Sequence, residues 1–428
     1  MNRVRLAYFP YLAAMALAAT GAGASEPTVE ELQREVTDLK SRLQALEDLV
    51  EQMSPAYRLN EVAVSPGEQV AVAQVAPEEA EDSAGINFGG ALRFNATYRD
   101  DADSSVGKRG ESGLDVFRLN VDGELDDILL SAEYRFYAYM STIRHGWVGY
   151  RFADDSVVQV GINQVPFGLL PFAAHNFWFG VPYYVGLGDD HDMGVKYLRD
   201  MGPWSTAIAF YKNEELNDAT NLDRYAFDLV RQDEQQNEET NQVNARLAYT
   251  FGQGSSCETE VGGSVEVGQL YNEVTGERGD HEAYALHLDS RCGRWNLQLQ
   301  GSTYEYDVEN PPGVDDTVVR VGAFAGAYDI AADADLYVAN LAYNFASPWE
   351  FIDSITCYND YSHLDKSLSG ASDSRLNTIG CAIGSGPLFT YVDYIMARNM
   401  PYFGAGSLAY GGEDDWQSRL NINIGYYW

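Results

Sequence analysis

Apolar and polar residues alternate along most of the chain from residue 86 to its end. Because successive side chains of a strand point to opposite faces, this period of two predicts strands with one apolar and one polar face. The pattern is clearest in residues 418–428, although a half-buried strand of a soluble sheet would alternate in the same way. We expect this terminal strand to direct membrane insertion through its apolar face, formed by Leu420, Ile422, Ile424, Tyr426 and Trp428.

The alternation recurs in sixteen segments. Short polar turns and long polar connections follow one another between them, as expected of the two ends of a membrane barrel. The stretch 317–333 also alternates, but we place it in a connection, because an even number of strands leaves both chain ends on the periplasmic side. The predicted strands are 86–99, 117–122, 128–138, 141–152, 156–165, 190–198, 204–213, 239–251, 258–272, 281–292, 295–306, 334–345, 351–363, 375–384, 388–398 and 418–428.

The predicted fold is an all-β, 16-stranded antiparallel transmembrane β-barrel over residues 86–428. A soluble sandwich would have to bury all the apolar faces against one another, whereas a barrel in lipid turns them outward. The polar faces then line a water-filled lumen. The candidate pore-lining residues are Arg93, Arg118, Glu133, Arg135, Lys196 and Arg246, with Glu258, Glu260 and Glu266 on the same polar faces.

The segments before the barrel indicate export and a separate helix. Residues 1–24 combine a basic start, an apolar run and a small-x-small cleavage site, which is typical of a secretory signal peptide. Residues 25–54 contain four heptads with apolar a and d positions, which predict a periplasmic coiled coil, with a lone amphipathic helix as the alternative. Residues 55–85 lose this period, contain spaced prolines and read as a flexible linker.

Composition limits the partners and the chemistry. The formal net charge of −36 makes nucleic acid an improbable partner, and the 29 Tyr and 40 Gly fit many strands joined by tight turns. No G-x-S-x-G sequence, P-loop or metal-spaced pair of histidines occurs, so we expect no enzyme activity, no cofactor and no metal.

Three acidic clusters fall in predicted connections. We expect them to be solvated surface; the alternative is that divalent cations link them to anionic lipid. The clusters are Asp100, Asp101 and Asp103; Asp189, Asp190 and Asp192; and Glu413, Asp414 and Asp415.

The four cysteines suggest two cross-strand disulfides in an exported chain. Folding the chain near residues 274–277 sets Cys257 opposite Cys292, and folding it near Ser369 sets Cys357 opposite Cys381. Four cysteines allow three pairings, so the sequence leaves the connectivity open.

The segment that follows the strand near residue 164 interrupts the alternation with some two dozen residues rich in Pro, Gly and aromatics. A loop this apolar is poorly placed in water, so we expect it to fold inward and narrow the lumen. An external loop at a subunit contact is the alternative. The proposed constriction residues are Pro166, Phe167, Gly168, Phe172, Phe177, Trp178 and Phe179.

Several short motifs resemble the phosphate-selective porin O/P family of Gram-negative outer membranes. They are V-G-x-x-x-x-P-F-G at 160–168, Y-N-D-Y-S at 358–362, D-Y-I at 393–395, A-R-N-M-P-Y at 397–402 and the terminal aromatic strand. The resemblance covers residues 86–428. It implies an outer-membrane trimer of sixteen-stranded barrels, each with its own pore narrowed by an inward loop.

The charges favour a general porin for small hydrophilic solutes or ions over a phosphate trap. A basic constriction selects anions, but the chain has only scattered lysines, at 40, 108, 196, 212 and 366. Arginine and glutamate on opposite walls would instead create a transverse field. The family resemblance leaves phosphate or anion selectivity open. The alternative function is a structural barrel that tethers the outer membrane to the periplasm through the coiled coil.

Overall fold

The computed structural model describes residues 85–404, 406–411 and 415–428. The expected signal peptide and coiled coil, and all of the expected linker except Gly85, lie outside this part of the chain. None of the helices in the described residues is long and apolar enough to cross a lipid bilayer.

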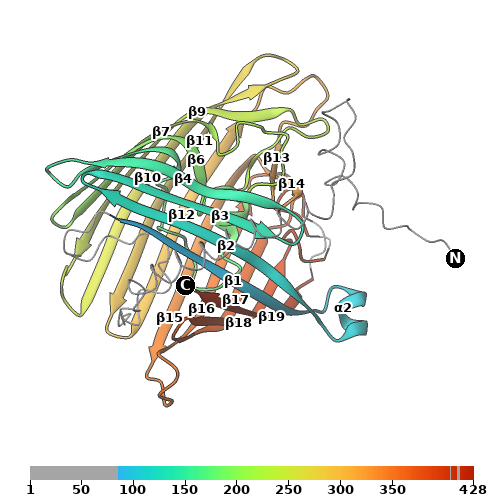
Figure 1. The fold of residues 1–428 in the computed structure, drawn as a ribbon. Coiled ribbons are helices and arrows are strands. Elements are labelled where there is room, and N and C mark those ends of the chain that lie inside the picture. The colour runs from blue at the N-terminus through green and yellow to red at the C-terminus, as the bar shows by residue number, and fades with distance from the viewer. Residues whose placement is uncertain (1–84, 405, 412–414) are drawn as a thin grey trace, which may run out of the picture. The chain divides into compact units, whose positions relative to one another are not determined.

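Sixteen antiparallel strands form a closed barrel, which confirms the expected fold class (Figure 1). Each barrel strand pairs with the next barrel strand along the chain, and β1 pairs with β19 to close the sheet. The barrel strands are β1 (Gly85–Arg99), β2 (Glu111–Leu125), β3 (Ile128–Tyr137), β4 (Ser141–Arg151), β5 (Val157–Gln164), β6 (His191–Met201), β7 (Trp204–Glu214), β9 (Asn237–Phe251), β10 (Cys257–Asn272), β11 (Arg278–Cys292), β12 (Trp295–Asp307), β15 (Asp333–Phe345), β16 (Ser354–Lys366), β17 (Ser374–Ser385), β18 (Leu388–Arg398) and β19 (Gln417–Tyr427).

The two faces of the barrel follow the period of two. On β19, Leu420 and Ile424 are exposed on the outside, whereas Asn421 and Asn423 are buried on the inside. The same alternation on β1 turns Phe94 outward. In lipid the outer side chains meet hydrocarbon, so the exposed apolar belt is the membrane-facing surface of the barrel.

The two ends of the barrel differ in the length of their connections. The end that carries the start of β1 and the end of β19 has tight turns, such as Asp126-Asp127 and Gly386-Pro387. The opposite end carries the long connections, one of which contains helix α2 (Asp103–Lys108) (Figure 1).

The alternating stretch 317–333 falls mainly in the connection between β12 and β15, as the parity argument predicts. It folds into a hairpin of β13 (Val318–Ala323) and β14 (Gly326–Ala331). Strand β13 also pairs with β8 (Asp228–Leu229), which lies in the connection between β7 and β9. These three strands form a small sheet separate from the barrel sheet.

The cysteines pair between neighbouring strands. Cys257 on β10 is bonded to Cys292 on β11, and Cys357 on β16 is bonded to Cys381 on β17. In both cases the partners are directly opposite in the strand register, near the end that carries the tight turns.

Gly194 tests the packing of the barrel wall. It lies at an irregularity in the pairing of β6 with β7, and a Cβ atom there would overlap the carbonyl oxygen of Phe210 and lie 2.7 Å from Cα of Tyr211. We expect Gly194→Ala to lower the free energy of unfolding by about 1–3 kcal/mol, the usual cost of overpacking, as measured by urea unfolding in detergent. Gly301→Ala is the control, since no atom lies within 4 Å of its Cβ position. Equal stability of the two variants would contradict this account of the wall.

Candidate functional site

The connection between β5 and β6, residues 165–190, lies inside the barrel. We call this segment the inward loop. It includes the short helix α3 (Val181–Tyr184), all of whose residues are buried. The loop contacts the inner wall through polar side chains of β9, β10, β12, β15, β16 and β18.

The first part of the loop is held at Gly168 and Leu169. The amide of Gly168 donates to Ser264 Oγ at 3.0 Å, and its carbonyl accepts from Arg246 Nε at 2.9 Å. The amide of Leu169 donates to Gln300 Oε1 at 2.8 Å. Gly168 has a φ of +60°, and a Cβ atom there would lie 2.8 Å from the amide carbon of Gln300. Glycine therefore allows both the turn and the close approach to the wall.

Asp360 on β16 is the main anchor of the second part. Its Oδ2 accepts from the backbone amides of His175 at 2.6 Å and Asn176 at 3.0 Å, and from Asn176 Nδ2 at 2.8 Å. Its Oδ1 lies 2.7 Å from His175 Nδ1. One carboxylate thus satisfies two backbone donors that the loop itself leaves unpaired.

Two further wall residues hold the loop beside Asp360. Ser362 Oγ accepts from the amide of Val181 at 2.9 Å, and Asp393 Oδ2 accepts from the amide of Phe177 at 3.3 Å. Tyr358 donates to the other oxygen of Asp393 at 2.6 Å. The anchors Tyr358, Asp360, Ser362 and Asp393 all belong to the motifs Y-N-D-Y-S and D-Y-I.

His175 contributes a charge-assisted contact. Burial alone would lower its pKa, but Asp360 beside the ring and the hydrogen bond with Asn296 offset this, and the pKa is raised. Its two ring nitrogens lie 2.7 Å from Asp360 Oδ1 and from Asn296 Oδ1, which suits a protonated ring that donates at both positions.

A cavity of about 910 Å³ runs beside the loop. At the end with the tight turns its lining includes Gly89, Pro387 and Trp428, and towards the long connections it includes Tyr139 and Tyr402. The cavity therefore extends along the barrel between its two ends.

Arginines dominate the charged lining of this cavity. They are Arg93, Arg99, Arg118, Arg135, Arg144 and Arg419. The lining carboxylates are Asp115, Asp122 and Asp189, so the lining has three more basic than acidic side chains (6 − 3 = 3). We call the group of six arginines the arginine wall.

Carboxylates pair with five of the six arginines, and Arg93 pairs with Asp115 and Arg99 with Asp101. Glu133, only 1% exposed, lies 2.5 Å from Arg135, 3.6 Å from Arg118 and 4.0 Å from Arg144. Asp189 accepts from Arg144 at 2.6 Å and from the hydroxyl of Tyr225 at 2.5 Å. Glu133 is not part of the cavity lining, whereas Asp189 lines the cavity beside Arg144.

Aromatic rings face the same arginines. Arg93 lies over Phe177 at 5.2 Å and Arg419 over Trp178 at 4.3 Å, and both rings belong to the inward loop. Such contacts orient the guanidinium groups. Arg93 is also ion-paired with Asp115 at 2.8 Å, whereas Arg419 has no carboxylate partner among the ion pairs of the described residues. The constriction therefore combines fixed positive charge with flat apolar surface.

The expected site residues separate into two groups. Arg93, Arg118 and Arg135 line the cavity, as do four of the expected loop residues, Phe172, Phe177, Trp178 and Phe179. Glu133 lies buried between the arginines. Pro166, Phe167 and Gly168 are buried where the loop enters the barrel. Lys196 donates to the carbonyl of Gln164, the last residue of β5, and Arg246 donates to the loop carbonyl of Gly168; neither residue is part of the cavity lining.

Sequence reasoning missed Arg99, Arg144 and Arg419 in the lining. Arg419 shares the polar face of the terminal strand with Asn421, so the alternation of polar and apolar residues could have identified it. Arg144 lies at a β-bulge, where the pairing of β3 with β4 shifts register between Glu133 and Tyr134. The bulge adds a residue to the strand, so strict alternation does not place Arg144.

The expectation that the acidic cluster at 189–192 is solvated surface is wrong. Asp189, Asp190 and Asp192 are 3%, 7% and 2% exposed. Asp100 and Asp101 instead take part in local contacts at the long-connection end, with Ser418 and Arg99. Glu413 and Asp414 lie outside the described residues.

Solved outer-membrane porins share this fold. OmpT of Vibrio cholerae in its trimer form has a TM-score of 0.52 and 16% identity, covering 81% of this chain and 100% of that chain. The anion-selective porin from Comamonas acidovorans has a TM-score of 0.54 and 13% identity, covering 81% and 100%. OmpF of Salmonella typhi, solved with daunomycin, has a TM-score of 0.55 and 13% identity, covering 81% and 98%.

No protein-family model matches this sequence, and no curated protein is significantly similar to it. The structural likeness at these identities shows the fold, a sixteen-stranded porin barrel.

Removing the Asp360 anchor tests how the loop is held. Asp360→Ala leaves the buried amides of His175 and Asn176 without acceptors, so we expect a loss of about 3–5 kcal/mol in stability and faster proteolysis within residues 165–190. Thermal unfolding by circular dichroism and limited proteolysis measure both effects. Asp365→Ala, an exposed position on the same strand, is the control. An unchanged loop in Asp360→Ala would refute this anchoring role.

The raised pKa of His175 gives the anchoring a pH dependence. A raised folded-state pKa contributes stability that is fully present below the ordinary histidine pKa of about 6.5 and is lost as pH rises through the folded value. We expect the wild type to lose more thermal stability than His175→Gln between about pH 6 and about pH 9. Parallel melting curves for the two proteins would argue against a charged His175.

Proposed function

We propose that this chain is an outer-membrane porin that lets small hydrophilic solutes diffuse passively. The observation that carries the proposal is the cavity of about 910 Å³ that reaches along the closed barrel and is narrowed by the inward loop. A barrel whose apolar belt faces lipid and whose interior is polar needs no further machinery for diffusion. No catalytic role is part of this proposal.

We further propose a weak preference for anions. The lining has an excess of arginine over aspartate, and Glu133, which pairs with Arg118, Arg135 and Arg144, is not part of the lining. A basic constriction attracts anions and repels cations. No lysine lines the cavity within the described residues, so the proposal includes no dedicated phosphate trap.

Membership of the phosphate-selective porin O/P family is also a proposal. Its support is that the motif residues Asp360, Ser362 and Asp393 all anchor the inward loop, which gives the shared motifs a common structural task. A trimer is proposed on the same resemblance, and the solved OmpT structure is described as a trimer form.

The alternative function, a structural barrel tethering the membrane to the periplasm, is less well supported. It requires no passage, whereas the cavity beside the loop extends between the barrel ends. Its tether, the expected coiled coil, lies outside the described residues.

Arg419 tests the arginine wall. Its guanidinium is held by the rings of Trp178 and Phe403 and by the carbonyl of Tyr402, so its loss leaves none of these neighbours as a buried unpaired charge. One unit charge at about 5 Å in water attracts an anion and repels a cation by about 0.8 kcal/mol each, so Arg419→Gln should lower the anion-to-cation permeability ratio by up to about sixteenfold. The measurement is the reversal potential in a salt gradient across a planar bilayer.

The control for this experiment is Arg278→Gln, an exposed arginine outside the cavity lining. It removes the same charge from the chain but should leave the permeability ratio unchanged. If both variants shift the ratio equally, the net charge of the protein and not the arginine wall sets selectivity.

A further inference from the structure

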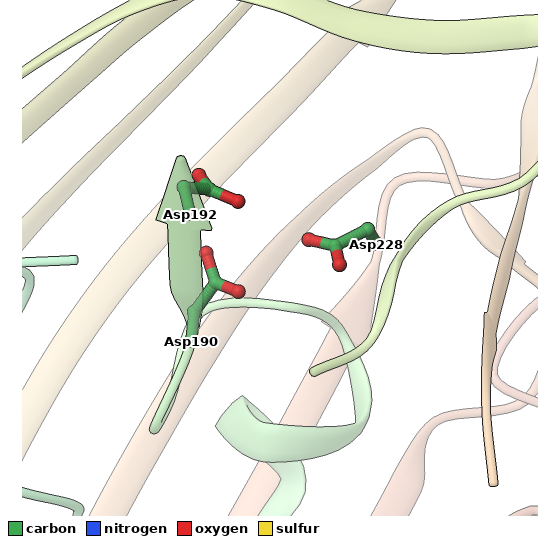
Figure 2. A group of neighbouring side chains, drawn as sticks. All are labelled: Asp190, Asp192 and Asp228. Carbon is green, nitrogen blue, oxygen red and sulfur yellow. The ribbon is translucent and has the colours of Figure 1, made fainter. Parts of the chain in front are cut away.

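Three buried carboxylates converge beside the base of the inward loop. Asp190 directly precedes β6, Asp192 lies on β6, and Asp228 lies on β8 in the connection between β7 and β9. Figure 2 shows the three side chains turned toward a shared space, and one oxygen of each lies within 4.8 Å of the others. Each of the three residues is at most 7% exposed.

The oxygens in this group have few hydrogen-bond donors. Asp192 Oδ1 has no partner among the described residues, and its Oδ2 accepts only a long bond of 3.3 Å from Gln242 Nε2. Asp190 Oδ1 accepts from the neighbouring backbone amide of His191 at 2.8 Å. Carboxylate oxygens this deeply buried are normally fully hydrogen-bonded, so the group has acceptor capacity to spare.

A fourth carboxylate nearby also lacks hydrogen-bond donors. Glu215 is 5% exposed, and neither of its carboxylate oxygens has a hydrogen-bond partner in the described structure. Its Oε2 lies 3.8 Å from Arg224 Nη1, the nitrogen that also lies 3.3 Å from Asp228 Oδ2. The carboxylates of Glu215 and Asp228 therefore face the same point.

The positive charge of one arginine is too small to balance the carboxylates around it. Arg224 forms ion pairs with Glu214, Glu215 and Asp228, and one guanidinium is thus shared by three carboxylates. Asp190 and Asp192 have no basic partner among the ion pairs of the described residues. Like charges at such short distances cannot all stay ionised in a buried site without a compensating cation.

We propose that Asp190, Asp192 and Asp228 bind a calcium ion, with the Glu215 carboxylate, whose oxygens accept no hydrogen bond in the described structure, beside it. The available ligands are all carboxylate oxygens, which hard divalent cations prefer. Calcium suits the irregular arrangement better than magnesium, because it accepts six to eight oxygens in flexible geometry whereas magnesium demands a near-ideal octahedron.

The ion joins two segments that are separate in the sequence. Asp190 and Asp192 fix the point where the inward loop returns to the wall, and Asp228 belongs to the connection that follows β7. Asp189, one residue before the site, accepts from Arg144 of the arginine wall and from Tyr225. Calcium at this site therefore holds the loop base and, through Asp189, the position of Arg144 at the passage.

Calcium titration calorimetry on the full chain tests the site directly. The protein is refolded in detergent without lipopolysaccharide, which itself binds divalent cations, and is stripped with EDTA. We expect one saturable calcium site per barrel, and at least about tenfold weaker binding in the double variant Asp192→Asn, Asp228→Asn. Asp155→Asn, at an exposed turn, should bind as the wild type does. The absence of saturable binding, or equal binding by the double variant, would overturn the proposal.

Thermal unfolding distinguishes a bound calcium ion from protons shared between the carboxylates. It also shows whether the variants fold. With calcium in place of EDTA, the melting temperature of the wild type should rise and that of the double variant should not. In EDTA the double variant should be at least as stable as the wild type, because it has lost like-charge repulsion. If calcium leaves the melting temperature of the wild type unchanged and the double variant melts at a higher temperature, the carboxylates share protons. That result rejects a metal site.

Discussion

Peptide groups in hydrocarbon have no water to bond with, so each unpaired N–H or C=O costs several kcal/mol. A sheet in lipid must therefore close, and here the pairing of β1 with β19 removes the last free edge. Closure fixes which face of every strand points outward. The apolar belt, the polar interior and the space for the inward loop all follow from this single requirement.

Inside the barrel a different constraint applies. Polar and charged groups that are shielded from bulk water need hydrogen-bond or ion-pair partners. The inward loop has many backbone donors and few side chains that can pair them. The wall provides acceptors at Asp360, Ser362 and Asp393, and the loop lies against β9 to β18. The arginines of β1 to β4 and β19 remain on the uncovered side, where they face the aromatic rings of the loop.

The period of two was enough to predict the sixteen strands, their parity and the outward residues, because lipid on one side and water on the other impose it on every strand. It could not show which inward residues bind backbone carbonyls in or beside the loop, so Lys196 and Arg246 were expected in the passage, whereas they donate to the carbonyls of Gln164 and Gly168. A bulge hid Arg144, since an extra residue breaks the alternation. Asp190 and Asp192 lie beside Asp228, which belongs to another connection, and the local sequence contains no sign of that contact.

The barrel is proposed to be a passive passage with a weak preference for anions and no phosphate trap. The most direct test of this proposal is the single-channel reversal potential of the wild-type barrel in a potassium chloride gradient, measured before and after adding phosphate. We expect an open channel with a modest anion-selective potential that phosphate does not block. A closed barrel, cation selectivity or a strong phosphate block would contradict it.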